Sequence, residues 1–432
     1  MSADANPPAG TRDFLPAEAA RRADVFATVR ATFERHGFAP LETPAFERLD
    51  VLTGKYGDEG DQLMFKILRR GIHEESGEAD LALRYDLTVP LARVVARYGS
   101  QLPTPFRRYQ VAPVWRADRP AKGRFREFVQ CDVDTIGSDS LVADASTLMA
   151  IHDVLSALGL AGFRFQLNSR SALKGLIEGY GIDASLEGDT LVALDKLEKV
   201  GVDGVAEELR ERGLEASNVQ ALASDLGEDA AGHLRERIAA TEAGQVGLGE
   251  VDALLDLLDG VELTAEFTPT LARGLGYYTG PIFEVVHDEL GSSIAAGGRY
   301  DGLVGTLGGP DTPACGGSVG LERVLAILGD GDDAPSGLDV LVTTLGGDAA
   351  ALALANRVRA LGWSTEAWTG SSGKLGTQLK YADRRAAVVA LIQGEQELAA
   401  GTVTVKHLSS GDQQTVGLDD LADHLRPLLG PS

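Results

Sequence analysis

The chain is poor in cysteine, and its two cysteines, Cys131 and Cys315, lie far apart and outside any CxxC pair. A disulfide framework needs several cysteines and zinc sites usually contain closely spaced pairs, so neither feature is predicted. The sequence also lacks an uninterrupted apolar run long enough to span a bilayer. Its N-terminal string, MSADANPPAGTRDFLP, lacks the basic and apolar regions of a secretory signal peptide. We therefore expect a cytoplasmic protein that does not enter a membrane.

Two common phosphate-binding loops are also missing. No GxxxxGK[ST] string occurs, and no GxGxxG opens a helix after a strand. These loops cradle phosphates with backbone N–H groups at the start of a helix. A nucleotide bound by this chain is therefore not held by a P-loop or a Rossmann turn.

Positive charge is scarce, because 64 acidic residues outnumber 40 basic ones and leave a formal net charge of -24. Phosphate neutralisation supplies most of the nonspecific affinity for nucleic acids, so the composition speaks against a protein that coats them. A local site remains compatible with the composition, since a basic patch in an acidic background can focus a polyanion onto one place. The alternative, that the acidity serves solubility alone, stays open.

Length and composition predict two or three folded domains. The chain has 432 residues, of which 44% are hydrophobic and 24% are charged. Each domain is then large enough to bury its own core. Apolar residues at helical spacing predict an amphipathic helix over 17–36 that stops at Gly37. A large antiparallel sheet is predicted from strand-like runs around 82–85, 107–116, 124–136 and 282–286.

Three later segments differ in character. Residues 169–263 are rich in Leu, Ala, Glu and Asp at helical periodicity, which predicts an inserted helical subdomain. The string GDGDDAPSGL, which contains residues 329–337, has the composition of a linker. Residues 338–432 then alternate between strand-like and helix-like runs. This alternation predicts a small α/β domain with a mixed, partly parallel sheet.

A basic cluster interrupts the acidic background. Seven basic side chains and a single acid, Asp118, lie between Phe106 and Arg126. The string RPAKG inside this stretch is typical of a hairpin turn, and residues two apart share one face of a strand. Odd positions from 125 to 133 are mostly apolar and predict a buried face. The even positions predict a polar face that Arg116 can reach, and they are Arg124, Arg126, Phe128, Gln130, Asp132 and Asp134.

This hairpin has two interpretations. A solvated face with ion pairs, each worth about 0–1 kcal/mol, explains the charges but not Phe128 among them. A purine stacked on Phe128, with its phosphates near Arg116, uses both features. Two more arginines lie in glycine-containing strings, Arg273 in LARGLGYYTG and Arg323 in ACGGSVGLERVL. Glycines permit close approach to a ligand and guanidinium groups pair with phosphate oxygens, so we favour nucleotide binding.

These strings together resemble one known family. They are similar to those of histidyl-tRNA synthetases, which are class II aminoacyl-tRNA synthetases. The matching strings are GTRDFLP, HGFAPLETPAFE, LRYDLTVPLAR, the basic hairpin, NSRSALKGL, RGLGYYTG, AAGGRYDGL and GLERVL. The tail string GKLGTQLKYAD resembles the family's anticodon-binding domain. RGLGYYTG and AAGGRYDGL are the discriminating strings, because HGFAPLETPAFE, the basic hairpin and GLERVL correspond to three motifs that all class II enzymes share.

The resemblance implies an α+β fold with a class II antiparallel sheet and flanking helices over residues 1–328. The helical insertion at 169–263 belongs to this catalytic domain. A linker at 329–337 and an α/β anticodon-binding domain at 338–432 follow. The family also implies a homodimer formed around Pro44. The implied enzyme uses ATP and Mg²⁺ to form histidyl-adenylate from L-histidine, and then transfers the histidyl group to tRNA(His).

The resemblance assigns roles in ATP binding to individual residues. Arg116 is implied to hold the α-phosphate, Phe128 to stack on adenine and Arg323 to bind the γ-phosphate. Arg273 matches the arginine that the family places against the α-phosphate and the histidine carboxylate. Arg116, Arg273 and Arg323 are therefore the implied catalytic residues. Arg124 lies where the family contacts the tRNA acceptor end, and no side chain is assigned as a metal ligand.

Six further positions are implied to bind the substrate histidine. Polar groups at both ring nitrogens would reject competitors, because a buried group that loses its partner costs free energy. The chain departs from the family at Gly276, where Asp is usual, and its two acids in the site are one methylene shorter than the common glutamates. The implied ligands are Asp86, Thr88 and Gln130 for the α-amino group, and Asp134, Tyr277 and Tyr278 for the imidazole.

Three other functions compete with this interpretation. A histidine-binding regulatory subunit of ATP phosphoribosyltransferase, which lacks aminoacylation activity, would resemble the core without the tail domain. A synthetase of another specificity is opposed by RGLGYYTG and AAGGRYDGL. A nucleic-acid-binding module without catalysis is opposed by the acidity and by the nucleotide-like hairpin.

Overall fold

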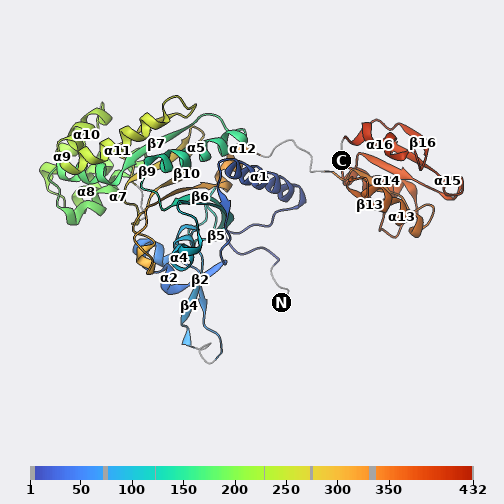
Figure 1. Cartoon of the computed structure of the whole chain (residues 1–432), viewed down its shortest axis with the longest axis horizontal. Helices are drawn as coiled ribbons and strands as arrows, with labels where there is room; N and C mark the ends of the chain where they lie inside the picture. The colour runs from blue at the N-terminus through green and yellow to red at the C-terminus, as the bar shows by residue number, and fades with distance from the viewer. Residues whose placement is uncertain are drawn as a thin grey trace. The chain divides into compact units, whose positions relative to one another are not determined.

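The computed structural model describes residues 5–71, 76–121, 123–227, 229–272, 276–329 and 337–430 (Figure 1). The chain divides into two compact units. One contains residues 1–13 and 25–331, and the other contains 14–24 and 332–432. Most of the linker predicted at 329–337 lies outside the described residues. Within the described ranges, no helix combines the length and apolar character needed to cross a membrane.

An eight-stranded sheet forms the centre of the first unit, in the order β1-β5-β6-β11-β10-β9-β7-β8. Its neighbours are antiparallel, except for the parallel pairs β1–β5 and β7–β8 at the two edges. The predicted antiparallel sheet is therefore confirmed, with a parallel pair added at either edge. The strands are β1 Ala39–Pro40, β5 Phe106–Trp115, β6 Glu127–Ile136, β7 Phe163–Ser169, β8 Ala265–Phe267, β9 Pro281–His287, β10 Leu290–Arg299 and β11 Ala314–Gly320.

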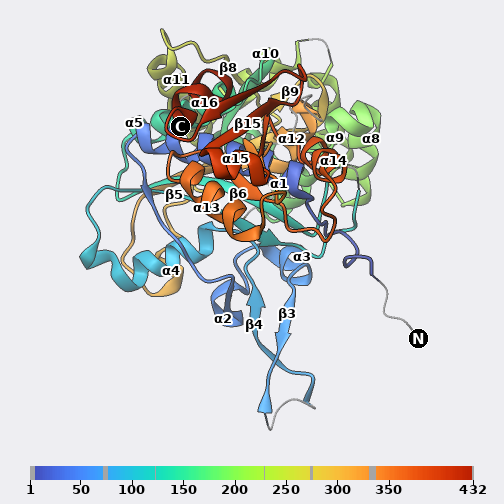
Figure 2. The same ribbon diagram turned by 90° about the vertical axis from the view of Figure 1, so that its right-hand side faces the viewer.

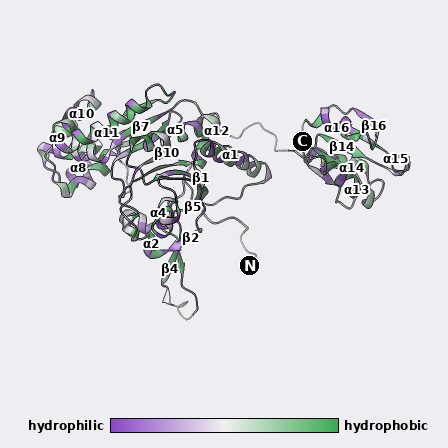
Figure 3. Ribbon diagram, viewed as in Figure 1, coloured by the Kyte–Doolittle hydropathy of each residue, from purple (hydrophilic) through white to green (hydrophobic). Residues whose placement is uncertain are grey.

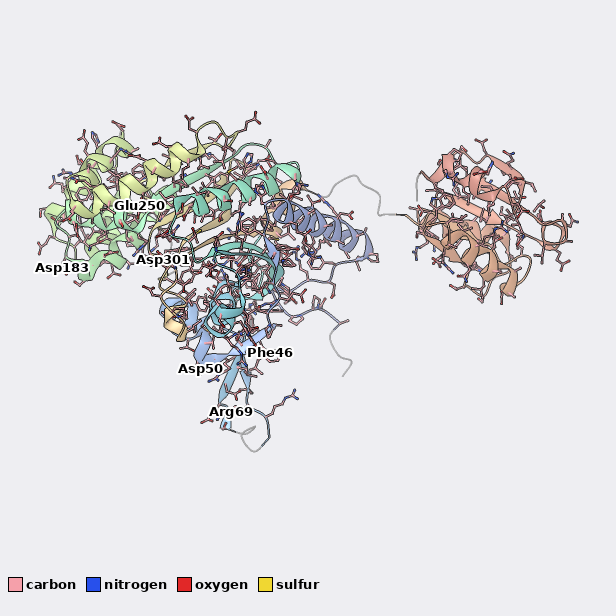
Figure 4. The ribbon with its side chains drawn as sticks, in the orientation of Figure 1. Phe46, Asp50, Arg69, Asp183, Glu250 and Asp301 are labelled. Carbon is pink, nitrogen blue, oxygen red and sulfur yellow. The ribbon has the colours of Figure 1, made fainter. Side chains whose placement is uncertain are left out.

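A smaller sheet, in the order β2-β4-β3, projects from the same unit (Figures 1 and 2). Its strands are β2 Phe46–Arg48, β3 Lys66–Leu68 and β4 Ala79–Leu83. In Figure 4, Phe46 and Asp50 lie near the base of this projection and Arg69 lies further along it. The strand predicted at 82–85 starts and ends earlier. The chain turns into a helix after it, because Oδ1 of Asp86 accepts the N–H of Val89, at 3.0 Å, at the start of α4.

Helices α1, α5, α11 and α12 cover one face of the large sheet. Val29, Leu148 and Val133 belong to one buried core with residues of the other two helices. Figure 3 shows hydrophobic and hydrophilic residues alternating along the helices, as expected when one face is buried. The predicted first helix is confirmed, and Gly37, at φ +79°, follows its end. Before residue 329 and outside the insertion, the helices in the described residues are α1 Pro16–Arg35, α2 Leu49–Leu52, α3 Gly57–Gln62, α4 Thr88–Tyr98, α5 Leu141–Ala157 and α12 Leu321–Leu328, with 3-10 turns at Gly99–Gln101 and Gly305–Leu307.

The segment between β7 and β8 is helical, as its periodicity predicts. Its described residues contain no strand. Leu173, Leu234 and Leu248 of three different helices are buried in one core. The helices are α6 Arg170–Gly179, α7 Glu187–Leu194, α8 Leu197–Glu211, α9 Ala216–Asp225, α10 Ala230–Ala239 and α11 Glu242–Leu258, with a 3-10 turn at Ala184–Leu186.

The second unit contains a five-stranded sheet in the order β13-β12-β14-β15-β16. β12 is parallel to both neighbours, and the remaining pairs are antiparallel, so the predicted mixed sheet is confirmed. Sequence patterns missed α15, which has no buried residue, and β16, whose residues are exposed or half-buried. The elements are β12 Val340–Val342, α13 Asp348–Arg359, β13 Thr365–Ala367, α14 Leu375–Arg384, β14 Val389–Ile392, α15 Glu395–Ala400, β15 Thr402–His407, β16 Gln413–Gly417 and α16 Leu421–Leu429.

Candidate active site

A pocket of about 410 Å³ opens on the sheet face opposite the helical core. Strands β6, β10 and β11, the starts of α4 and α12, and the loop before β9 contribute to its wall. One predicted site residue, Arg273, lies outside the described residues. The other predicted site residues all line this pocket, and they are Asp86, Thr88, Arg116, Arg124, Phe128, Gln130, Asp134, Tyr277, Tyr278 and Arg323.

Glycines of β11 form part of the pocket wall. Gly316 lies directly across the β6–β11 ladder from Asp134. A Cβ at Gly316 would overlap the Asp134 carboxylate, and one at Gly317 would lie 2.5 Å from the ring of Phe283. Gly316 is therefore required by the close packing against this carboxylate, and Gly317 by the packing against Phe283.

Two acceptor oxygens in the pocket wall have neither a hydrogen-bond nor an ion-pair partner among the described residues. Asp86 uses Oδ1 to accept the Tyr56 hydroxyl at 2.9 Å, while its buried Oδ2 has no hydrogen-bond partner among the described residues. Gln130 donates Nε2 to the hydroxyl of Ser318 at 3.0 Å, and its buried Oε1 is likewise unpartnered within the described part of the chain. Burial raises the pKa of Asp86. Such unpaired groups cost about 1–3 kcal/mol each, which favours a donor ligand between them.

A second carboxylate lies among aromatic rings. The Tyr300 hydroxyl donates to Oδ1 of Asp134, and Oδ2 lies 2.8 Å from Nη2 of the fully buried Arg108. Burial raises the pKa of Asp134, although the Arg108 guanidinium opposes this shift. The ring centroid of Tyr277 lies 5.1 Å from that of Tyr278 and 6.0 Å from that of Tyr300. This part of the pocket can hold a flat, polar ring against aromatic surface and a carboxylate.

The cationic part of the pocket contains Arg116 and Arg323. Arg116 donates Nε to the carbonyl of Tyr85 at 3.1 Å, and its Cζ lies 5.2 Å from the centroid of the Phe128 ring. Arg323, in the first turn of α12, donates to the carbonyl of Ser293. Backbone contacts thus hold both guanidinium groups in the pocket wall, Arg116 beside an aromatic ring, an arrangement suited to a nucleotide phosphate chain.

The residues of the basic cluster point in different directions, and Arg126, predicted on the polar face of the hairpin, does not line the pocket. Arg107 donates to Ser146 at 2.7 Å, and Arg108 is buried behind the pocket. Arg126 donates to the carbonyl of Asp118 at 3.0 Å. Lys122 lies outside the described residues. Arg116 and the more exposed Arg124, which pairs with Asp118 at 2.8 Å, line it.

The predicted alternation of faces fails at the start of the hairpin's second strand. β6 begins only at Glu127, so the three residues before it lack strand geometry. Phe125, expected on the buried face, lines the pocket instead. The Cζ of Arg12 lies 3.7 Å from its ring centroid, and Arg126 donates its N–H to the carbonyl of Gly10 at 2.8 Å. The N-terminal segment therefore supports this side of the pocket.

Sequence reasoning assigned no role to several residues at the site. Tyr300 belongs to the histidine-specific string AAGGRYDGL, so the signal for it was present. Ser318 and Glu322 belong to the string around Arg323, but hydroxyl and carboxylate groups at these positions carry no spacing signal. Arg108 and Tyr56 become visible only when their partners, far away in sequence, are known.

Comparisons with known proteins agree over nearly the whole chain. Residues 10–324 match the histidyl-tRNA synthetase family, and residues 339–428 match an anticodon binding domain. The histidine–tRNA ligase of Cytophaga hutchinsonii is 40% identical over 451 aligned residues, covering 97% of this chain and 98% of that protein. The crystal structure of histidyl-tRNA synthetase from Nostoc superposes with a TM-score of 0.80 at 30% identity, covering 99% of this chain and all of the other.

A structure from Bacillus halodurans, described as an ATP phosphoribosyltransferase regulatory subunit/histidyl-tRNA synthetase, has a TM-score of 0.73 at 23% identity. The alignment covers 88% of this chain and 97% of the Bacillus chain. At this sequence identity it shows only that the two proteins share a fold. The family match and the Cytophaga relative are more informative. The family match spans residues 10–324, and the relative is 40% identical over 97% of this chain. The chain belongs to the histidyl-tRNA synthetase family.

Proposed function

We propose that this protein ligates L-histidine to tRNA(His) at the expense of ATP, as a class II aminoacyl-tRNA synthetase. Histidine and ATP form histidyl-adenylate and pyrophosphate, and the histidyl group then passes to the 3′ end of the tRNA. The observation that carries the proposal is the pair of unpartnered oxygens, Oδ2 of Asp86 and Oε1 of Gln130, in a pocket that also contains Arg116 and Arg323. Acceptors for an ammonium group and cations for phosphates thus share one cavity.

The histidine would bind with its ammonium group at Asp86, Thr88 and Gln130. Its ring would lie near the carboxylate of Asp134, beside Tyr277 and Tyr278. The Thr88 side chain lies close enough to the Tyr277 hydroxyl to oppose the rise in its pKa that burial causes, which links the two parts of the binding site. A ring without two polar nitrogens would leave a buried polar group unpaired, which is the basis proposed for selectivity.

The ATP would bind at the cationic part of the pocket, with adenine against Phe128. The histidine carboxylate attacks the α-phosphorus, a phosphorus–oxygen bond forms, and pyrophosphate leaves. Arg116 would stabilise the negative charge that builds up on the α-phosphate, and Arg323 would hold the γ-phosphate. Arg273 is proposed for the same α-phosphate and the carboxylate, on the basis of family membership alone. Such fixed cations favour the transition state because they need no reorganisation.

Mg²⁺ is proposed as a companion of ATP. Among the described residues no group of three or more His, Cys, Asp or Glu side chains could hold a metal ion. Mg²⁺ bound with a nucleotide needs only one or two carboxylates, because phosphates and water supply its other ligands. Glu322, beside Arg323 in the pocket wall, fits that limited requirement. When bound, the ion would neutralise phosphate charge.

We also propose the division of labour along the chain. Residues 1–328, including the helical insertion at 169–263, would form the catalytic domain, 329–337 the linker and 338–432 the anticodon-binding domain. Arg124 would contact the tRNA acceptor end, since it lines the pocket while its side chain is 58% exposed. Removal of 338–432 should impair tRNA charging more than adenylate formation. Equal loss of both steps would contradict a separate role for the tail.

A homodimer in the cytoplasm completes the proposal. Phe46 of β2 is 52% exposed and Leu68 of β3 is 57% exposed, and these two strands are the edges of the small projecting sheet. This sheet adjoins Pro44, around which the family resemblance places the dimer contact. A second copy of the chain would cover these apolar side chains.

The function is tested by ATP–pyrophosphate exchange with purified protein and each of the twenty amino acids, without tRNA. Exchange with histidine alone is the expected result, followed by charging of tRNA(His). No exchange, combined with calorimetric binding of histidine, would instead favour the regulatory subunit of ATP phosphoribosyltransferase.

A further inference from the structure

Asp132 is a buried carboxylate that the proposed reaction does not use directly. Asp132 is 2% exposed and does not line the pocket. It lies on the same face of β6 as Gln130, and directly across the β6–β11 ladder from Ser318. The Ser318 hydroxyl interacts with Asp132 closely enough to lower its pKa, and it receives Nε2 of Gln130 at 3.0 Å. Ser318 therefore lies between the buried acid and the pocket-lining amide.

The direction of these hydrogen bonds follows from counting protons. A serine hydroxyl has one hydrogen to donate, whereas a carboxylate can only accept. When Asp132 is the acceptor, Ser318 donates its single hydrogen to Asp132. Ser318 must then accept a hydrogen bond from Gln130. Gln130 can supply one only through its NH₂ group, so its carbonyl Oε1 is left for a ligand. That oxygen is the one for which the described part of the chain supplies no partner.

Without the acid, the opposite orientation becomes available. Ser318 could then donate its hydrogen to the carbonyl of Gln130, and the amide would turn its NH₂ group toward the ligand. A positively charged ammonium group would meet a donor instead of an acceptor. We propose that Asp132 is a positioning residue that acts through Ser318 to fix the amide orientation of Gln130, so that an acceptor faces the α-amino group of histidine.

The groups around Asp132 leave it able to accept a hydrogen bond. Arg108 on β5 places Nη2 3.9 Å from Oδ2 of Asp132, and Arg84 also interacts with its charge. The other charged groups that face it are Asp134 on β6 and Asp86 before α4, both of which oppose its ionisation. The acceptor role survives partial protonation, since a protonated carboxyl still offers a carbonyl oxygen.

This inference rests on the proposed function, and its test separates the two. The experiment measures KM for histidine and KM for ATP by pyrophosphate exchange in Asp132→Ala, Ser318→Ala and the double variant. Thr135→Val is the matched control, because Thr135 is a buried polar residue of the same strand whose Oγ1 has no partner in the described chain. Wild-type exchange with histidine must be present; its absence would refute the proposed function before the variants are compared.

Each single variant should raise KM for histidine by about tenfold or more, the range for losing a hydrogen bond to a charged group. KM for ATP should stay within about twofold, and Thr135→Val should leave both constants near the wild-type values. The double variant should have a histidine KM no higher than that of the more impaired single variant, because both substitutions interrupt the same series of side chains. If Asp132→Ala fails to fold, Ser318→Ala carries the test alone.

Two results would overturn the inference. One is a histidine KM within about twofold of wild type in Ser318→Ala. The other is a multiplicative loss in the double variant, which would show that Asp132 acts through Arg108 and Asp134 rather than through Ser318. Competition by histidinol, which keeps the amino group and the ring but lacks the carboxylate, should weaken in parallel with the histidine KM.

Discussion

Arg108 and Asp134 face each other across the β5–β6 ladder, with Nη2 of the arginine 2.8 Å from Oδ2 of the acid and both side chains buried. Asp132 lies on the same side of the sheet, so one cation serves two buried carboxylates. Removal of one member of a buried ion pair costs more than the pair contributes, because the remaining charge is left without compensation.

Arg108→Ala should therefore destabilise the fold by about 3–5 kcal/mol. The neighbouring Arg107→Ala is the matched control, since Arg107 points to Ser146 and lies over Phe38, and it should cost about 1 kcal/mol. Urea unfolding of the purified variants measures both values. Similar losses in the two variants would argue against a special role for the buried arginine.

Stability should also depend on pH through Asp132. Burial raises the pKa of Asp132 to about 7. Between pH 4 and pH 7 the folded protein then holds a proton that the unfolded chain has released, so the free energy of unfolding falls as pH rises. Asp132→Asn removes this contribution. As pH rises from 5 to 8, the free energy of unfolding of the variant should increase by about 1–3 kcal/mol relative to that of wild type, as measured by urea titrations. Parallel curves of unfolding free energy against pH for the two proteins would contradict this assignment.

Arg116 and Arg124, which both line the pocket, should affect different steps. Arg116→Ala should lower the rate of histidine-dependent pyrophosphate exchange by about 10²–10³, the usual effect of losing a group that stabilises transition-state charge. Arg124→Ala should leave exchange nearly unchanged and reduce transfer to tRNA. Single-turnover transfer from preformed adenylate distinguishes the steps, and loss of exchange in Arg124→Ala would disprove its assignment to the acceptor end.

The exposed apolar residues of the small sheet should control assembly. Phe46→Glu places a charge where a second copy is proposed to pack, and sedimentation should shift from dimer to monomer. Leu352→Glu is a suitable control, because Leu352 is similarly exposed, at 57%, but belongs to α13 of the second unit. A wild-type protein that sediments as a monomer would refute the proposed dimer.

The elements with long, regular patterns were predictable, and the short ones were not. Helix α1 and strands β5 and β9 follow from apolar periodicity within a residue or two. Strand β4 was misplaced because Asp86, which lines the pocket, starts a helix immediately afterward and terminates the extended segment. The six residues of α15 bury nothing, so no hydrophobic signal accompanied them.

At the site, residues in recognisable strings were predictable and those that support them were not. The charge cluster did not reveal that Arg108 is buried, where it neutralises acids on the next strand. Its role depends on a ladder register that local composition does not contain. Phe125 was assigned to the wrong face, because the alternation rule applies only where a strand exists.

The unpartnered oxygens of Asp86 and Gln130 have a consequence for the lifetime of the protein in a cell. A ligand that binds only the folded state raises its stability, by about 2.7 kcal/mol at one hundred times Kd. The transiently unfolded fraction, which proteases degrade, would shrink accordingly. The supply of histidine would thus set how long each catalytic domain survives as well as how fast it works, linking the abundance of the enzyme to that of its amino acid.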